Sequence, residues 1–171
     1  MSRQSRTRTT RIIQEAEGYL ELGMAQHALD LLDQVPEPGT FRGQIQYLRG
    51  AAFRELKQYS AAIAPLGEAG ELKPSNINVW LALGWCQKRL GRLDLAIEAL
   101  EQAREIRPNE AVVHYNLACY WSLARNKERA LDCLARALDI DADYRDLIGN
   151  EADFDPIRTD PDFQALTSII V

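Results

Sequence analysis

The most constraining feature of this sequence is a self-similarity with a step of 34 residues. Alanine recurs at this step, and small residues and leucine recur at fixed offsets from it. The aligned positions are Ala28, Ala62, Ala96 and Ala130; Ala16, Gly50, Gly84 and Ala118; Leu32, Leu66, Leu100 and Leu134; Leu29, Ile63, Ile97 and Leu131; and Leu22, Leu56, Leu90 and Ala124. A step of this length indicates stacked units, each too small to bury its apolar face alone.

Each copy has the pattern of two short helices, shown most clearly in residues 76–109. Apolar residues follow helical spacing from Val79 onwards, and Gly91 is predicted to end the first helix because glycine accepts a left-handed backbone. Asp94 is predicted to cap the second helix, which Pro108 ends.

These residues resemble the tetratricopeptide repeat (TPR) family, whose pattern is W-x2-L-G-x2-Y, then A-x3-F, then P. The matching residues are Trp80, Leu83, Gly84, Ala96, Leu100 and Pro108, with Gln87 in place of the aromatic. Neighbouring copies match through Gly50, Phe53, Ala62, Leu66 and Pro74, and through Leu117, Trp121, Ala130 and Leu134. The first copy is the most degenerate, and Pro36 and Pro38 shorten its second helix.

The resemblance implies an all-α fold, a right-handed superhelical α-solenoid of about four helix-turn-helix repeats with a C-terminal capping helix. The expected organisation is a basic tail at 1–8, repeats at 9–42, 43–76, 77–110 and 111–144, and a capping segment at 145–171.

The segment after residue 144 looks like the terminal segment of many bacterial TPR proteins. A solenoid needs a cap because its last repeat exposes an apolar side. Asp160 is predicted to cap a helix that has Pro161 in its first turn. The expected buried face consists of Phe163, Leu166, Ile169 and Ile170.

The N-terminal residues contain Arg3, Arg6 and Arg8 without an apolar partner. We expect a solvated, disordered tail. The alternative is an electrostatic tether to an acidic partner, a membrane surface or a nucleic acid.

Composition narrows the functional classes. The net charge of −5 disfavours nucleic-acid binding, and no apolar run approaches the roughly 20 residues of a membrane span. The three cysteines, Cys86, Cys119 and Cys133, form no CxxC pair, which indicates a reducing compartment such as the cytoplasm.

No catalytic or cofactor motif is recognisable, so we expect neither an enzyme nor a cofactor. Asp139, Asp141 and Asp143 imitate the opening of a calcium-binding loop, but Tyr144 stands where glycine is needed for the turn. His114 aligns with Trp80 and is expected to pack in the core, so no metal site is predicted.

The resemblance also implies that the first helices of the repeats line a concave groove. The predicted peptide-binding residues are Tyr47, Arg54, Asn78, Leu81, Trp85, Lys88, Arg89, Tyr115 and Cys119. Trp85 lies off the face that Trp80 and Leu83 define, so a second surface must bury it, either in the fold (Ala51 or Cys119) or in a partner.

One TPR subclass clamps the carboxylate of chaperone tails with lysine, asparagine and arginine side chains. The matching positions here are Ile13, Glu17, Leu48, Asn78 and Ala82, or Tyr47, Ala51, Ala82, Val112 and Asn116. Neither set can hold a carboxylate, so a chaperone-tail clamp is disfavoured.

The function predicted is therefore a noncatalytic scaffold that holds a peptide or helix of another protein. The alternative is a structural module that forms a homo-oligomer through its groove or one end of the array.

Overall fold

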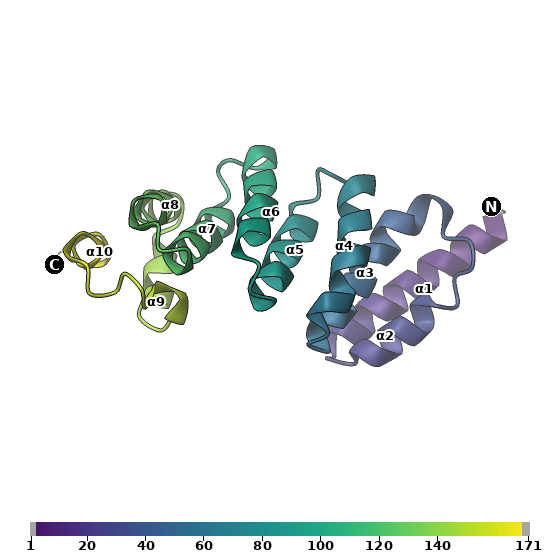
Figure 1. Cartoon of the computed structure of the whole chain (residues 1–171). Helices are drawn as coiled ribbons and strands as arrows, with labels where there is room; N and C mark the ends of the chain where they lie inside the picture. The colour runs from purple at the N-terminus through teal and green to yellow at the C-terminus, as the bar shows by residue number, and fades with distance from the viewer. Residues whose placement is uncertain (1–2, 169–171) are drawn as a thin grey trace. The chain divides into compact units, whose positions relative to one another are not determined.

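The computed structural model describes residues 3–168, and within that range it contains helices and no β-strand (Figure 1). The α-helices are α1 (Arg3–Glu21), α2 (Ala25–Leu32), α3 (Arg42–Glu55), α4 (Tyr59–Leu72), α5 (Ile77–Arg89), α6 (Leu93–Ile106), α7 (Ala111–Leu123), α8 (Lys127–Ile140), α9 (Arg145–Ile148) and α10 (Pro161–Thr167). Short 3-10 helices lie at η1 (Gly39–Phe41), η2 (Ala142–Tyr144) and η3 (Ala152–Phe154). The predicted all-α class is confirmed.

The chain divides into two compact units at the turn between Leu90 and Gly91, inside the third predicted repeat. The first unit contains α1 to α5, and the second contains α6 to α10.

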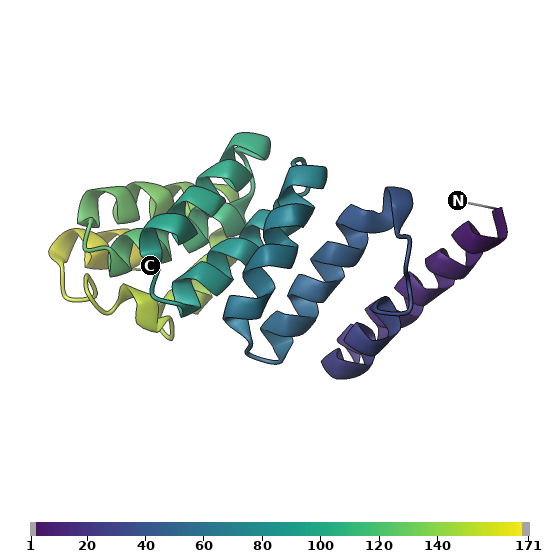
Figure 2. The same ribbon diagram turned by 45° about the vertical axis from the view of Figure 1, so that its right-hand side comes forward.

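Neighbouring helices of the first unit pack in chain order, α1 on α2, α3 on α4, and α4 on α5. Figure 2 shows α3 and α4 side by side. The repeat-defining alanines and leucines fill the core, as expected from their 34-residue step; buried examples are Ala16, Ala28, Leu32, Ala62 and Leu66. Helix α2 is short, as the two prolines after it predict.

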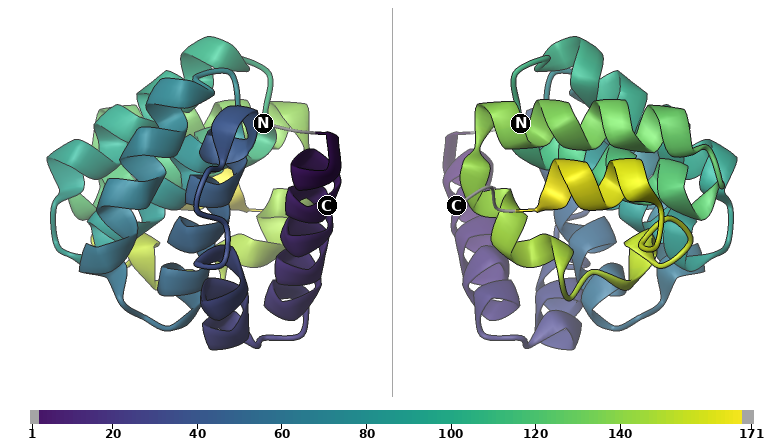
Figure 3. Two further views of the ribbon diagram at one scale, coloured as in Figure 1. Left: turned by 90° about the vertical axis from the view of Figure 1, so that its right-hand side faces the viewer. Right: turned by 90° about the vertical axis from the view of Figure 1, so that its left-hand side faces the viewer.

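In the second unit α7 packs on α6 and on α8, and α10 lies along α8 (Figure 3, right). The Asp160 carboxylate caps α10 by accepting hydrogen bonds from the backbone N–H groups of Asp162 and Phe163 at 2.9 and 3.4 Å. Lys127 Nζ donates to Asp160 at 3.0 Å, and this bond holds the pKa of Asp160 below its usual value. The predicted N-cap is confirmed.

The face of α10 agrees with the prediction as far as the described residues reach. Phe163 is buried and Leu166 is partly buried, whereas Ile169 and Ile170 lie outside the described residues.

Two local predictions are wrong. The expected irregular tail is helical from Arg3 on, because the segment contains no glycine or proline before Gly18 to break α1. Asp94 is not an N-cap: α6 begins at Leu93, and Arg92 occupies the capping position without a side-chain hydrogen bond. Asp94 instead stands in the first turn, where the helix dipole favours an acidic side chain.

One polar contact repeats with the 34-residue step. Trp80 Nε1 donates to the Pro74 carbonyl at 2.9 Å, and His114 Nε2 lies 2.7 Å from the Pro108 carbonyl. A carbonyl only accepts, so Nε2 carries the proton of His114. His114 is therefore a buried structural residue, as its alignment with Trp80 predicts.

The turns between paired helices share one backbone conformation. Gly23, Lys57, Gly91 and Arg125 are 34 residues apart, and their φ angles are 71°, 59°, 74° and 57°. Gly91 ends α5 as predicted. At Lys57 and Arg125 the same left-handed turn is formed by residues with a Cβ atom, which strains the backbone.

We expect Lys57→Gly and Arg125→Gly each to raise the free energy of unfolding by about 0.5–1 kcal/mol, because glycine removes this strain. Urea unfolding followed by circular dichroism measures the change. Gly91→Ala is the matched reverse variant, since a Cβ there meets no atom within 4 Å and only the backbone is affected. Unchanged midpoints in both glycine variants would contradict the strain.

Candidate functional site

The predicted binding residues come from three helices. Tyr47 and Arg54 lie on α3, while Asn78, Leu81, Trp85, Lys88 and Arg89 lie on α5, all in the first unit. Tyr115 and Cys119 lie on α7 in the second unit. The two groups are therefore separate candidate sites.

Trp85 is the centre of the first group. Its indole is partly exposed and meets the Tyr59 ring edge-on, with 5.2 Å between centroids and an interplanar angle of 80°. The Arg54 and Arg89 guanidinium carbons lie 5.9 and 5.6 Å from the centroid of the indole. Arg89 also lies 5.4 Å from the centroid of the Tyr59 ring. We call Arg54, Tyr59, Trp85 and Arg89 the Trp85 cluster.

The Trp85 cluster rests on a small apolar core between α4 and α5. Ala62 and Leu66 of α4 and Ala82 and Cys86 of α5 are buried, and the Trp85 ring packs against this core. Burial raises the pKa of the Cys86 thiol to about 11, and the nearby positive charge of Arg54 opposes this shift. The cluster thus places two cations and two aromatic rings over a packed base, an arrangement that favours cation–π attraction.

The remaining predicted residues of the first unit lie on the same two helices, α3 and α5. Tyr47 and Leu81 are partly buried, and Asn78 is exposed near the start of α5. Leu81 stands one helical turn before Trp85 on the same face. Lys88 and Arg89 are in the last turn of α5, where positive charge also stabilises the helix dipole.

The structure corrects the prediction that Tyr115 and Cys119 are open to a ligand. Tyr115 is 5% exposed and Cys119 is 2% exposed. The Tyr115 ring contacts those of Tyr144 and Phe154, at 4.9 and 5.7 Å between centroids. The C-terminal segment covers this face of α7 through η3.

The same segment is fixed by two arginines that could otherwise be taken for ligand-binding residues. Arg145 donates to the Leu166 and Ser168 carbonyls at 3.1 and 3.4 Å. Arg158 donates to the carbonyls of Ile148, Gly149 and Glu151 at 3.3, 3.3 and 2.6 Å. These guanidinium groups satisfy backbone carbonyls, and their role is structural.

Burial also sets the chemistry of two cysteines. It raises the pKa of the Cys86 and Cys133 thiols to about 11 each. At pH 8 only about one in a thousand of these thiols is then a thiolate, which is the reactive form.

We therefore expect Cys86 and Cys133 to react with iodoacetamide at pH 8 far more slowly in the native protein than in urea. Peptide mass spectrometry after timed alkylation measures both rates. Equal rates in native and unfolded protein would show that neither thiol is buried.

Comparison with known proteins finds the same repeat that the helix pairs of the structure show. The sequence profile described as "Tetratricopeptide repeat" matches residues 53–118, which run from the end of α3 to α7. This match and the 34-residue helix pairs identify the chain as a TPR protein, which confirms the resemblance found in the sequence. Comparison with curated proteins gives no match.

Solved structures show the same fold. The chain in the crystal structure of MamA is 20% identical in sequence to this chain. The superposition covers 81% of each chain and has a TM-score of 0.73. MamA from Desulfovibrio magneticus RS-1 is 21% identical and covers 79% of this chain and 76% of its own, with a TM-score of 0.72. YrrB, described as a TPR protein with an unusual peptide-binding site, is 26% identical and covers 80% of this chain and 70% of its own, with a TM-score of 0.71.

Within residues 3–168, none of the helices combines the length and the apolar character that crossing a bilayer requires.

Proposed function

We propose that this protein is a noncatalytic interaction module that binds a segment of a partner protein at the Trp85 cluster. One observation carries the proposal: a partly exposed tryptophan stands between two guanidinium groups on a packed helical surface. Tryptophan and arginine are the residues that most often dominate the binding energy of interfaces. The TPR fold supports the proposal because such repeats present extended surfaces to partners.

The positive charges and the indole ring of the Trp85 cluster determine which side chains a partner segment must carry. Arg89 is exposed, and Arg54 is partly exposed with its guanidinium 3.2 Å from Glu55. A complementary segment carries an apolar or aromatic side chain that packs on Trp85 and a carboxylate that approaches Arg89. The peptide-binding site named in the description of YrrB is consistent with this class of ligand.

The boundaries of the proposed surface follow from burial. It includes Tyr47, Arg54, Tyr59, Leu81, Trp85 and Arg89, with Asn78 and Lys88 at its edge. It omits Tyr115 and Cys119, because the C-terminal segment covers them.

The first experiment is a measurement of molecular mass in solution over a range of protein concentrations, followed by affinity capture from native lysate. A monomer that retains a partner and loses it on Trp85→Ala supports the proposal. A concentration-dependent homo-oligomer that Trp85→Ala leaves unaltered would favour self-assembly instead. Trp85→Phe is the matched control, since it keeps an aromatic ring against Tyr59.

A further inference from the structure

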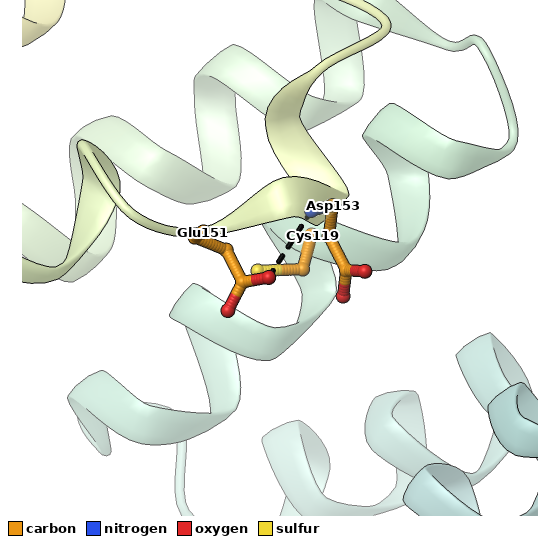
Figure 4. Close-up of side chains that lie close together, drawn as sticks. All are labelled: Cys119, Glu151 and Asp153. Carbon is orange, nitrogen blue, oxygen red and sulfur yellow. Dashed lines mark hydrogen bonds between the residues drawn. The ribbon is translucent and has the colours of Figure 1, made fainter.

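Three potential metal ligands meet where the C-terminal segment crosses α7. Cys119 comes from α7, and Glu151 and Asp153 come from the start of η3 (Figure 4). The sulfur of Cys119 and one carboxylate oxygen of each acid all lie within 4.8 Å of one another. The cysteine is buried and the two acids are partly buried, so the group lies at the edge of the core.

Glu151 also has a local structural role. The Glu151 carboxylate accepts a hydrogen bond from the Asp153 backbone N–H at 3.1 Å and so caps η3.

Tyr115 provides a second, independent observation. It stands one helical turn before Cys119 on the same face of α7, and it is 5% exposed. Its hydroxyl is fully buried and has no hydrogen-bond partner. The centroid of its ring lies 5.7 Å from that of Phe154, which directly follows Asp153 in η3, so Tyr115 lies beside the group. A buried hydroxyl without a partner is costly and indicates an additional ligand or water at this place.

We propose that Cys119, Glu151 and Asp153 bind a zinc ion, with a water molecule as fourth ligand that accepts a hydrogen bond from the Tyr115 hydroxyl. A thiolate ligand favours zinc over calcium or magnesium, which prefer oxygen ligands alone. Zinc accepts sulfur and carboxylate oxygen in a tetrahedral arrangement, and three protein ligands with one water is a common set. On binding, the Cys119 thiol releases its proton to solvent, so one thiolate and two carboxylates surround the dication.

Binding of the ion would affect the second unit, which contains all three ligands. The ion would join η3 to α7 and so fasten the C-terminal segment over the last repeat. This role is distinct from partner binding at the Trp85 cluster, and the two can fail independently.

The test uses the full chain without a histidine tag and cobalt(II) as a spectroscopic probe for zinc. We expect titration to produce a sulfur-to-cobalt charge-transfer band and the visible bands of tetrahedral cobalt, both removed by added zinc. Cys119→Ser should abolish the charge-transfer band. Cys133→Ser is the matched control, because Cys133 is also buried but lies outside the group, and it should retain the band.

A second variant keeps the thiol and tests the carboxylates. Asp153→Asn should weaken cobalt binding by about tenfold or more while circular dichroism stays unchanged. This variant decides the question if Cys119→Ser does not fold. The proposal is overturned if the wild-type chain gives no charge-transfer band, or if the band persists in Cys119→Ser or at full affinity in Asp153→Asn.

Discussion

Replacing Phe154 by alanine is expected to lower the free energy of unfolding by about 3–5 kcal/mol, the usual cost of removing a buried phenylalanine side chain. Phe154 is fully buried, and its ring lies 5.7 Å from the Tyr115 ring and 5.4 Å from the Phe163 ring. The substitution therefore leaves a cavity between α7 and α10, and the C-terminal segment loses its main contact with the repeat. Urea unfolding followed by circular dichroism measures the loss.

Leu147→Ala is the control for that variant, because it removes an apolar side chain from the same segment at a site that is 53% exposed. We expect a change within about 0.5 kcal/mol. If the unfolding curves of the two variants coincide, Phe154 does not hold the segment on α7.

Trp85→Ala is expected to weaken binding of the captured partner by about 2 kcal/mol or more, roughly thirtyfold. The ring supplies the apolar contact and orients both guanidinium groups of the Trp85 cluster. Calorimetric titration of the partner segment against both proteins measures the loss.

Arg89→Ala should cost less than Trp85→Ala, and its effect should shrink at high salt because exposed charges are screened. Circular dichroism checks that each variant is folded. Unaltered affinity in a folded Trp85→Ala protein would contradict binding at this surface.

The repeats and their helix pairs were predictable because the 34-residue step places the same packing residue in each copy. Gly50 shows why: a Cβ there would stand 2.4 Å from Leu66 Cγ, so α3 and α4 approach too closely for a larger residue. The left-handed turns at Lys57 and Arg125 were missed, since only Gly23 and Gly91 carry the residue typical of that conformation. Because all four positions are 34 residues apart, the turns at Gly23 and Gly91 would have been enough to predict the turns at Lys57 and Arg125.

The candidate site was predictable only in part. The helical face of Trp85 indicates that a second surface must meet it, but the sequence suggested Ala51 or Cys119, and the ring it meets is Tyr59 on α4. The residues at the same position of the other repeats, Ala25, Leu93 and Lys127, are not aromatic. The aromatic side chain of Tyr59 was therefore the one feature of the sequence that could have indicated this contact.

The covering of Tyr115 was not predictable from periodicity. Tyr144 is the last residue of the fourth predicted repeat and is not one of its recurring positions, and Phe154 lies beyond the repeats. Their contacts with α7 join residues far apart in the chain. The segment was expected to cap the last repeat, and it packs on both helices of that repeat, α7 and α8.

Site-specific photocrosslinking tests partner binding at the Trp85 cluster most directly. A photoreactive residue at Leu81 lies one turn from Trp85, whereas one at Leu72, an exposed leucine, lies about 20 Å along α4 from Tyr59. We predict a partner crosslink from position 81 and none from position 72. Excess unlabelled wild-type protein should remove that crosslink, and excess Trp85→Ala protein should not. Equal crosslinking from both positions, or equal competition by both proteins, would contradict the proposed binding surface.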